Sequence, residues 1–272
     1  MKIKPDMALT CPKIILFDWH ATLVDTLDAM YHAVDDVIPQ FKKLELLNRL
    51  AKPEDNKTDE DRKLVKYVRD HQRLHPKIKT DKRISRTDIF EILFAKDNEA
   101  KYIAHLEFNK CYRRYFGEIH PLEEGIDLML EELRSFGIKL GVLTNRDREF
   151  IEHEINVIQA HGWAPLFDTM VCGDDVDKRK PAPDLILKAL ELLDVEPDMS
   201  CWYVGDSTTD TIAANDAGVT NIFYNGANWD DNWLMKIFPG TTKYPHKPDF
   251  IVHSFKEFKQ LVESTLDVKF KN

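Results

Sequence analysis

Short apolar segments alternate with amphipathic helical patterns over the second half of the chain, and this alternation constrains the fold more than any other feature. After His120-Pro121 the sequence carries five apolar runs, at 138–145, 167–173, 200–206, 220–226 and 249–254. Helical patterns such as 148–162 and 183–195 separate the first four, and such connections join parallel strands through right-handed crossovers. We predict an α/β fold with a doubly wound, Rossmann-like parallel sheet, to which residues 13–17 add a buried strand.

The segment between this first strand and residue 117 has a different pattern. Apolar residues recur at helical spacing between Val34 and Leu47, and helix periodicity returns from Thr87 to Tyr115. The sequence HPKIKTDKR, residues 75–83, looks irregular. We therefore predict two domains: an α/β core made of residues 1–26 and 117–272, and an inserted all-helical cap, residues 27–116.

The charge of the chain is uneven. Its net charge of −9 argues against general affinity for nucleic acid, although residues 62–86 carry ten basic side chains against Asp70 and Asp81. A solvated helix face is the favoured interpretation of this basic run. The alternatives are that it binds an anionic ligand or an acidic partner surface. Binding of RNA or DNA is a weaker alternative.

The composition also bears on the compartment. No apolar run approaches the ~20 residues that span a bilayer, and the segment MKIKPDMALTCP lacks an apolar signal core. The four cysteines form no metal-like spacing, and Cys172 and Cys201 lie in apolar runs where buried free thiols are expected. These features predict a cytoplasmic protein with no membrane partner.

Four polar clusters lie at or just after the carboxyl ends of predicted strands. They are Asp18, Thr144-Asn145, Lys180, and Asp206 with Asp210. A doubly wound sheet brings these ends together, and ligands of such sheets bind there. The sequence therefore predicts one polar site built from all four clusters.

The text around these clusters resembles the haloacid dehalogenase superfamily. The segment IILFDWHATL, residues 14–23, is similar to the signature hhhhDxDx[TV], with His20 in the place of the second Asp. GVLTNR, DKRKPAPD and YVGDSTTD are similar to the remaining motifs, and the spacing and flanks look most like the phosphoglycolate phosphatase group. That group carries a helical cap where this chain has its insert. The resemblance covers residues 12–25 and 119–226.

The resemblance implies a Mg²⁺-dependent phosphatase that hydrolyses a small phosphate monoester. A carboxylate can attack phosphorus, so Asp18 is the expected nucleophile, forming an aspartyl-phosphate. Mg²⁺ prefers oxygen ligands, and the side chains of Asp18 and Asp206 are expected to supply them. The resemblance adds the backbone carbonyl of His20. Asp210 holds a metal-bound water or orients Lys180; its alternative role is favourable charge at a helix N-terminus.

The remaining site residues are expected to bind the phosphoryl group. Lys180 would place a positive charge on the phosphate and on phosphorylated Asp18, unless it is an ordinary surface lysine. Thr144 offers a hydroxyl, and Asn145 offers a backbone amide or a side-chain donor. Asn145 could instead cap the following helix.

His20 leaves three functions open. The family residue at this position is a general acid and base, a role that contributes about 10²–10⁴-fold to the rate. If His20 fills that role, the chain is a phosphatase acting on a small phosphorylated metabolite. If His20 is a poor base, the phosphoenzyme persists and the chain transfers its phosphoryl group to another acceptor. If turnover is lost, the chain is a regulatory protein that binds phosphate and Mg²⁺.

Overall fold

The computed structural model describes residues 9–56, 58–81, 86–115, 117–242 and 245–269. The chain divides into two compact units. Unit 1 combines residues 1–25 with 120–272, and unit 2 is residues 26–119. The expected boundaries, 27 and 116, lie within a few residues of these limits.

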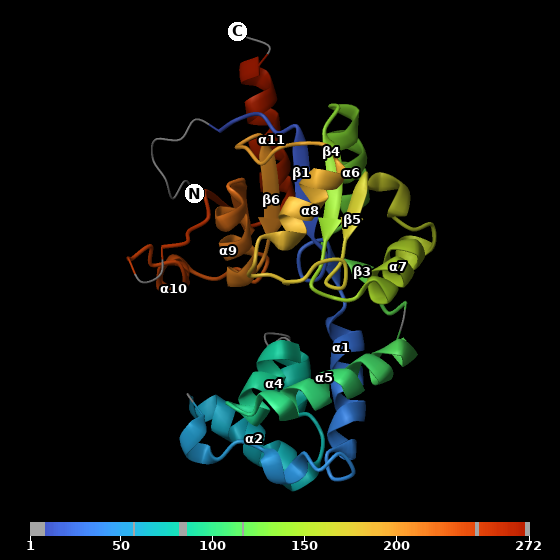
Figure 1. The fold of residues 1–272 in the computed structure, drawn as a ribbon, viewed down its shortest axis with the longest axis vertical. Coiled ribbons are helices and arrows are strands. Elements are labelled where there is room, and N and C mark those ends of the chain that lie inside the picture. Colours follow the sequence, from blue (N-terminus) through green and yellow to red (C-terminus); the bar gives the residue numbers. More distant parts are fainter. Residues whose placement is uncertain (1–8, 57, 82–85, 116, 243–244, 270–272) are drawn as a thin grey trace. The chain divides into compact units, whose positions relative to one another are not determined.

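Unit 1 contains a six-stranded parallel sheet in the order β5-β4-β1-β6-β7-β8. The chain passes from β1 to β4 and β5 on one side, then returns to β6, β7 and β8 on the other (Figure 1). The predicted doubly wound α/β sheet is confirmed. The strands are β1 (Ile14–Asp18), β4 (Lys139–Leu143), β5 (Thr169–Val171), β6 (Cys201–Gly205), β7 (Thr220–Tyr224) and β8 (Phe250–Val252).

A second, two-stranded antiparallel sheet lies where the chain leaves and re-enters unit 1. It pairs β2 (Val24–Asp25) with β3 (His120–Pro121). The helices of unit 1 are α6 (Ile126–Ser135), α7 (Arg148–Val157), α8 (Asp184–Leu192), α9 (Thr208–Ala217), α10 (Asp231–Ile237) and α11 (Phe255–Lys269), with short 3₁₀ helices at Ile158–Ala160 and Ala164–Leu166.

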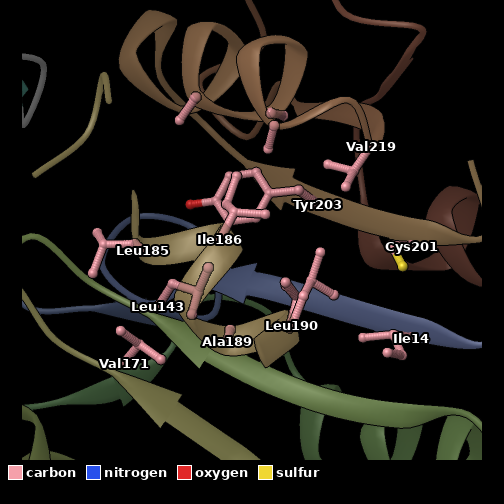
Figure 2. Packing of buried hydrophobic residues seen from close by; sticks show 14 of the residues in the cluster. Ile14, Leu143, Val171, Leu185, Ile186, Ala189, Leu190, Cys201, Tyr203 and Val219 are labelled. Atoms are coloured by element: carbon pink, nitrogen blue, oxygen red, sulfur yellow. The ribbon is translucent and has the colours of Figure 1, made fainter. Parts of the chain in front are cut away.

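The strands of the main sheet are buried on both faces, as expected for a parallel sheet covered by helices. Ile14 and Leu16 of β1 belong to a cluster that packs against α8 and α9, which Figure 2 shows from close by. Phe17 points the other way and meets the rings of Phe255 and Phe258 of α11. The two-residue period of a strand therefore places alternate side chains of β1 in two separate cores.

The register of the strands brings the polar clusters to one edge. Asp18 pairs with Leu143 of β4, and Phe17 pairs with Val204 of β6, so β1, β4 and β6 end at nearly the same level. The strand order reverses around β1, which lies between β4 and β6. This is the position at which open α/β sheets bind ligands.

Helices and the loops between them make up unit 2 in its described residues. Its helices are α1 (Leu27–Val37), α2 (Asp59–His71), α3 (Pro76–Asp81), α4 (Arg86–Phe94) and α5 (Asn98–Tyr112), with 3₁₀ helices at Ile38–Gln40, Leu47–Arg49, Pro53–Asp55 and Arg113–Tyr115. The expectation of an irregular segment at 75–83 is wrong for α3. Proline is favoured at the first position of a helix, where its missing N–H is not needed. Residues 82 and 83 lie outside the described residues.

The basic run forms an exposed surface where its side chains are described. Six of the ten are exposed: Arg62, Lys63, Lys66, Arg69, Arg73 and Lys77. Arg62 pairs with Asp59, and Arg69 donates to the backbone oxygens of Leu50 and Ala51. These contacts favour the solvated helix face. The side chains of Lys79, Lys82, Arg83 and Arg86 lie outside the described residues.

Two expectations from composition can be compared with the structure. All four cysteines are free thiols, and Cys172 and Cys201 are buried as expected. Across the part of the chain that the structure describes, no helix combines the length and apolar character needed to cross a membrane.

Gly141 of β4 allows close packing between neighbouring strands. A Cβ at this position would lie 2.5 Å from Leu16 Cδ2 and 2.7 Å from Thr169 Cγ2. We expect Gly141→Ala to lower the free energy of unfolding by about 1–3 kcal/mol, measured by chemical denaturation, because the core must shift to accept the methyl group. Lys139→Ala, on the exposed end of the same strand, is the control and should change it by less than about 0.5 kcal/mol. Equal effects would contradict this account.

Candidate functional site

Three carboxylates gather at the carboxyl edge of the sheet. Asp18 ends β1, Asp206 follows β6 directly, and Asp210 lies in the first turn of α9. One oxygen from each lies within 4.8 Å of the others, and Asp18 and Asp210 are buried. The Thr22 hydroxyl lies 3.3 Å from Asp18 Oδ2 and 3.5 Å from Asp206 Oδ1. The structure thus brings together the three carboxylates that the sequence assigned to metal binding.

Gly205 and Ser207 fix the position of Asp210. A Cβ at Gly205 would lie 2.5 Å from Asp210 Cγ, so only glycine lets α9 approach the end of β6 this closely. Ser207 is the N-cap of α9 and forms a capping box with Asp210, in which each side chain bonds the other residue's backbone N–H. Asp210 therefore supports the helix N-terminus with Oδ2 and keeps Oδ1 for the site.

Lys180 is the positive centre of this cluster. Its Nζ donates to Asp18 Oδ1 at 2.5 Å, to Asp210 Oδ1 at 2.7 Å and to the Tyr203 hydroxyl at 2.9 Å. The side chain is buried, so the alternative of an ordinary surface lysine is wrong. The contact with Asp210 favours the orienting role among those expected for that carboxylate.

The side chain of Asn145 holds the backbone of Lys180. Asn145 Nδ2 donates to the Lys180 carbonyl at 3.0 Å, and the Lys180 N–H donates to Asn145 Oδ1 at 2.8 Å. The expectation that Asn145 caps the next helix is wrong, because α7 begins after Asp147. One Nδ2 proton is used by the Lys180 carbonyl, so Asn145 can offer a phosphate its backbone amide and its second Nδ2 proton.

Burial and repulsion between carboxylates set the electrostatics of the site. Desolvation, opposed by Lys180 and reinforced by Asp210, raises the pKa of Asp18 to about 6. Desolvation, followed by repulsion from Asp18 and Asp210, raises the pKa of Asp206 well above its usual value. Burial also acts to raise the pKa of Asp210, but Lys180 outweighs it and the pKa is lowered.

This imbalance of charge fits a divalent cation. Three carboxylates face one ammonium group, and burial, followed by repulsion between the carboxylates, raises the pKa values of Asp18 and Asp206 in spite of Lys180. Hard cations such as Mg²⁺ take carboxylate oxygens as ligands. Asp18 and Asp206 are the residues with oxygen atoms that Lys180 leaves available.

His20 and Thr144 lie beside this cluster. The His20 ring is half-buried, with Nδ1 3.4 Å from the Thr144 hydroxyl and Nε2 2.9 Å from Glu154 Oε2. Thr144 follows β4 and is buried, and its hydroxyl also accepts the Arg146 N–H at 3.2 Å. His20 therefore lies within the site, between Thr144 and a carboxylate of α7.

Sequence reasoning missed two residues of this arrangement, Glu154 and Tyr203. Both occupy positions that a pattern assigns to apolar side chains. Glu154 lies four residues after Phe150 on the buried face of α7, and Tyr203 lies two after Cys201 on one face of β6. A carboxylate is almost never fully buried unless it is paired, so Glu154 on an apolar face was a signal that could have been used.

The chain was compared with known proteins. The family model described as haloacid dehalogenase-like hydrolase matches residues 15–224. A pyrophosphatase PpaX of Bacillus mycoides is 30% identical over 155 residues, 56% of this chain and 66% of the relative. A phosphoglycolate phosphatase of Xylella fastidiosa is 33% identical over 148 residues, 53% of this chain and 63% of the relative. The chain thus spans less than two thirds of either relative.

Solved structures show the same fold. CbbY from Rhodobacter sphaeroides, solved in complex with phosphate, has a TM-score of 0.55 at 22% identity, covering 91% of this chain and 96% of its own. A hydrolase of the superfamily from Ehrlichia chaffeensis has a TM-score of 0.54 at 18% identity, covering 95% and 100%. The family model spans most of the chain and includes Asp18, Lys180 and Asp210, so the chain belongs to the haloacid dehalogenase-like hydrolase family, as its motifs predicted.

Proposed function

We propose that this protein is a Mg²⁺-dependent phosphatase that hydrolyses a small phosphate monoester through an aspartyl-phosphate on Asp18. The observation that carries the proposal is the bond of Asp18 to Lys180 within a cluster of carboxylates at the sheet edge. Such a cluster holds a nucleophile, a positive charge for the phosphate and oxygen ligands for a cation in one place. The relatives named phosphoglycolate phosphatase and pyrophosphatase support it.

In the first step, a carboxylate oxygen of Asp18 attacks phosphorus and the bond to the ester oxygen breaks. Lys180 neutralises charge on the phosphoryl oxygens, while the Thr144 hydroxyl and the Asn145 backbone amide bind them. Asp210 and Tyr203 keep Lys180 oriented toward Asp18. When Mg²⁺ is bound, by Asp18, Asp206 and the His20 carbonyl, it compensates further negative charge on the phosphate.

His20 handles the proton in both steps of this proposal. It gives a proton to the leaving alkoxide, and later takes one from the water that attacks the aspartyl-phosphate and releases inorganic phosphate. The substrate is a small phosphorylated metabolite of the cytoplasm, and the helical unit 26–119 is the cap that selects it.

The reaction itself provides the first test. We expect Mg²⁺-dependent release of phosphate from a panel of phosphate esters, and we expect Asp18→Asn to abolish it because an amide cannot attack phosphorus. His20→Ala should slow turnover at least tenfold, within the ~10²–10⁴-fold range of general acid–base catalysis. Unchanged turnover in His20→Ala would exclude its role. If the wild type hydrolyses none of the esters, the result would instead favour a regulatory protein that binds phosphate and Mg²⁺ without turnover.

Cation binding can be measured without activity. Mg²⁺ at about 100 times its dissociation constant should raise the free energy of unfolding by about 2.7 kcal/mol, because it binds only the folded cluster. Asp206→Asn should remove most of this increase. Asp174→Asn is the matched control, since Asp174 belongs to a second acidic group with Cys172 and Asp175, in which Asp175 is paired with Arg148. An equal loss in both variants would contradict the assignment.

The raised pKa of Asp18 gives a third prediction. The folded state holds this proton more tightly than the unfolded chain, so its stabilising effect is present below the ordinary pKa of 3.8 and is lost as pH rises through about 6. In Mg²⁺-free buffer at neutral pH, Asp18→Asn should therefore be more stable than the wild type, by about 1–3 kcal/mol.

The difference should be mostly lost near pH 4, where Asp18 is protonated in the folded state and close to its ordinary pKa of 3.8 in the unfolded chain. Denaturation curves at the two pH values provide the measurement. Glu191→Gln, on the exposed face of α8, is the control and should show no such dependence on pH. A less stable Asp18→Asn protein at neutral pH would show that the bond to Lys180 outweighs the burial of the charge.

A further inference from the structure

Both ring nitrogens of His20 have a partner in the structure. Nε2 lies 2.9 Å from Glu154 Oε2, and Nδ1 lies 3.4 Å from the Thr144 hydroxyl. Glu154 is only 1% exposed and comes from α7, far from His20 in the sequence. The ring therefore has one edge toward a buried carboxylate and the other toward the strand end where the phosphate is expected.

The contacts of Glu154 determine which partner donates. Its Oε2 also accepts the Trp19 indole N–H at 2.9 Å, and an indole nitrogen can only donate. The guanidinium of Arg146 lies 3.4 Å from Oε1 and adds positive charge on the other side. Glu154 is therefore an acceptor toward both neighbouring rings, which makes His20 Nε2 a donor.

The contacts of Thr144 complete the assignment. Its oxygen accepts the Arg146 N–H, and with no phosphoryl group bound its own proton can be donated to His20 Nδ1. A neutral imidazole carries one N–H and one lone pair, and which nitrogen holds the proton is set by the hydrogen bond of the other. The lone pair of His20 thus lies on Nδ1, on the side of Thr144.

Packing keeps Glu154 in this position. Trp19 is fully buried, and its ring lies edge-on to Trp163 at 6.0 Å and to Phe167 at 6.4 Å between centroids. Phe150 and Ile151, on the same face of α7 as Glu154, are buried too. The carboxylate therefore has little freedom to turn away from His20.

We propose that Glu154 is a positioning residue for catalysis: it holds the Nε2–H of His20, so that Nδ1 gives its proton to the leaving group when the ring is an imidazolium and takes a proton from water when the ring is neutral. This inference rests on the proposed function. Glu154 would act as the buried Asp of a Ser-His-Asp triad does, by holding the imidazole in one tautomer. In this proposal His20, held by Glu154, takes the place of the single Asp that the family signature has at this position.

The test compares Glu154→Gln in two backgrounds, with p-nitrophenyl phosphate as the probe. In the wild type the substitution should lower steady-state turnover at least tenfold, the effect of losing one hydrogen bond to a charged group. In His20→Asp, which has no ring to orient, the same substitution should change turnover less than twofold. Glu152→Gln, an exposed carboxylate of α7, is the matched control and should leave turnover unchanged in both.

The step that is slowed gives a second readout. Because p-nitrophenolate leaves without needing a proton, Glu154→Gln should still release it rapidly in a burst and then hydrolyse the phosphoenzyme slowly. A merely structural Glu154, needed for Trp19 or α7, would instead lower turnover equally in the wild-type and His20→Asp backgrounds and reduce the burst. Either result would overturn the proposal.

A spectroscopic measurement separates this inference from the proposed function. The ¹⁵N shifts of the His20 ring, assigned by their loss in His20→Asn and recorded at alkaline pH, should show the Nε2–H form in the wild type and a mixture in Glu154→Gln. An unchanged tautomer would overturn the positioning role. A fixed tautomer in a protein that hydrolyses no ester would show that the proposed activity fails while Glu154 does orient the ring.

Discussion

The bonds of Lys180 to Asp18 and Asp210 are the interaction on which the rest of the site depends. They place one ammonium among three carboxylates at a buried sheet edge, where unpaired charge is costly. The end of β1, the first turn of α9 and the loop that carries Lys180 must meet for this to happen. Gly205 allows the close approach, and Asn145 anchors the Lys180 backbone. Burial nevertheless raises the pKa of Asp18 to about 6, against the opposing effect of Lys180.

The architecture and the main site residues could be predicted because they depend on local patterns. Apolar runs alternating with helical periodicity define a parallel sheet, and the carboxyl ends of its strands meet at one edge. Asp18 ends β1 and Asp206 follows the neighbouring strand β6, so their proximity follows from topology once the strands are assigned. Lys180 was found from its KPAPD motif, in the loop between β5 and α8. The strand order reverses at β1, which explains why Asp18 lies at the centre.

The remaining details depend on contacts between segments far apart in sequence. From its sequence, Asn145 could cap a helix or anchor the Lys180 backbone. Only the path of the neighbouring loop in the structure shows that it does the second. Tyr203 and Glu154 follow an apolar period, so periodicity treats them as core although their polar atoms reach the site. Residues 76–81 form α3 although their sequence looks irregular, because Pro76 suits the first position of a helix.

Having His at position 20, where the family signature has Asp, changes more than the acid or base itself. The two oxygens of a carboxylate are equivalent, so a carboxylate can exchange protons in either orientation. The two nitrogens of an imidazole are not equivalent, because in the neutral ring only one has a lone pair. A histidine in the acid/base role that we propose therefore needs a second residue to determine which nitrogen carries the lone pair. Glu154 is placed to do so, from a helix position that otherwise favours apolar side chains. We therefore interpret Glu154 and His20 as one unit. His20 differs from the family signature, Glu154 lies on a helix face that is otherwise apolar, and each feature accounts for the other.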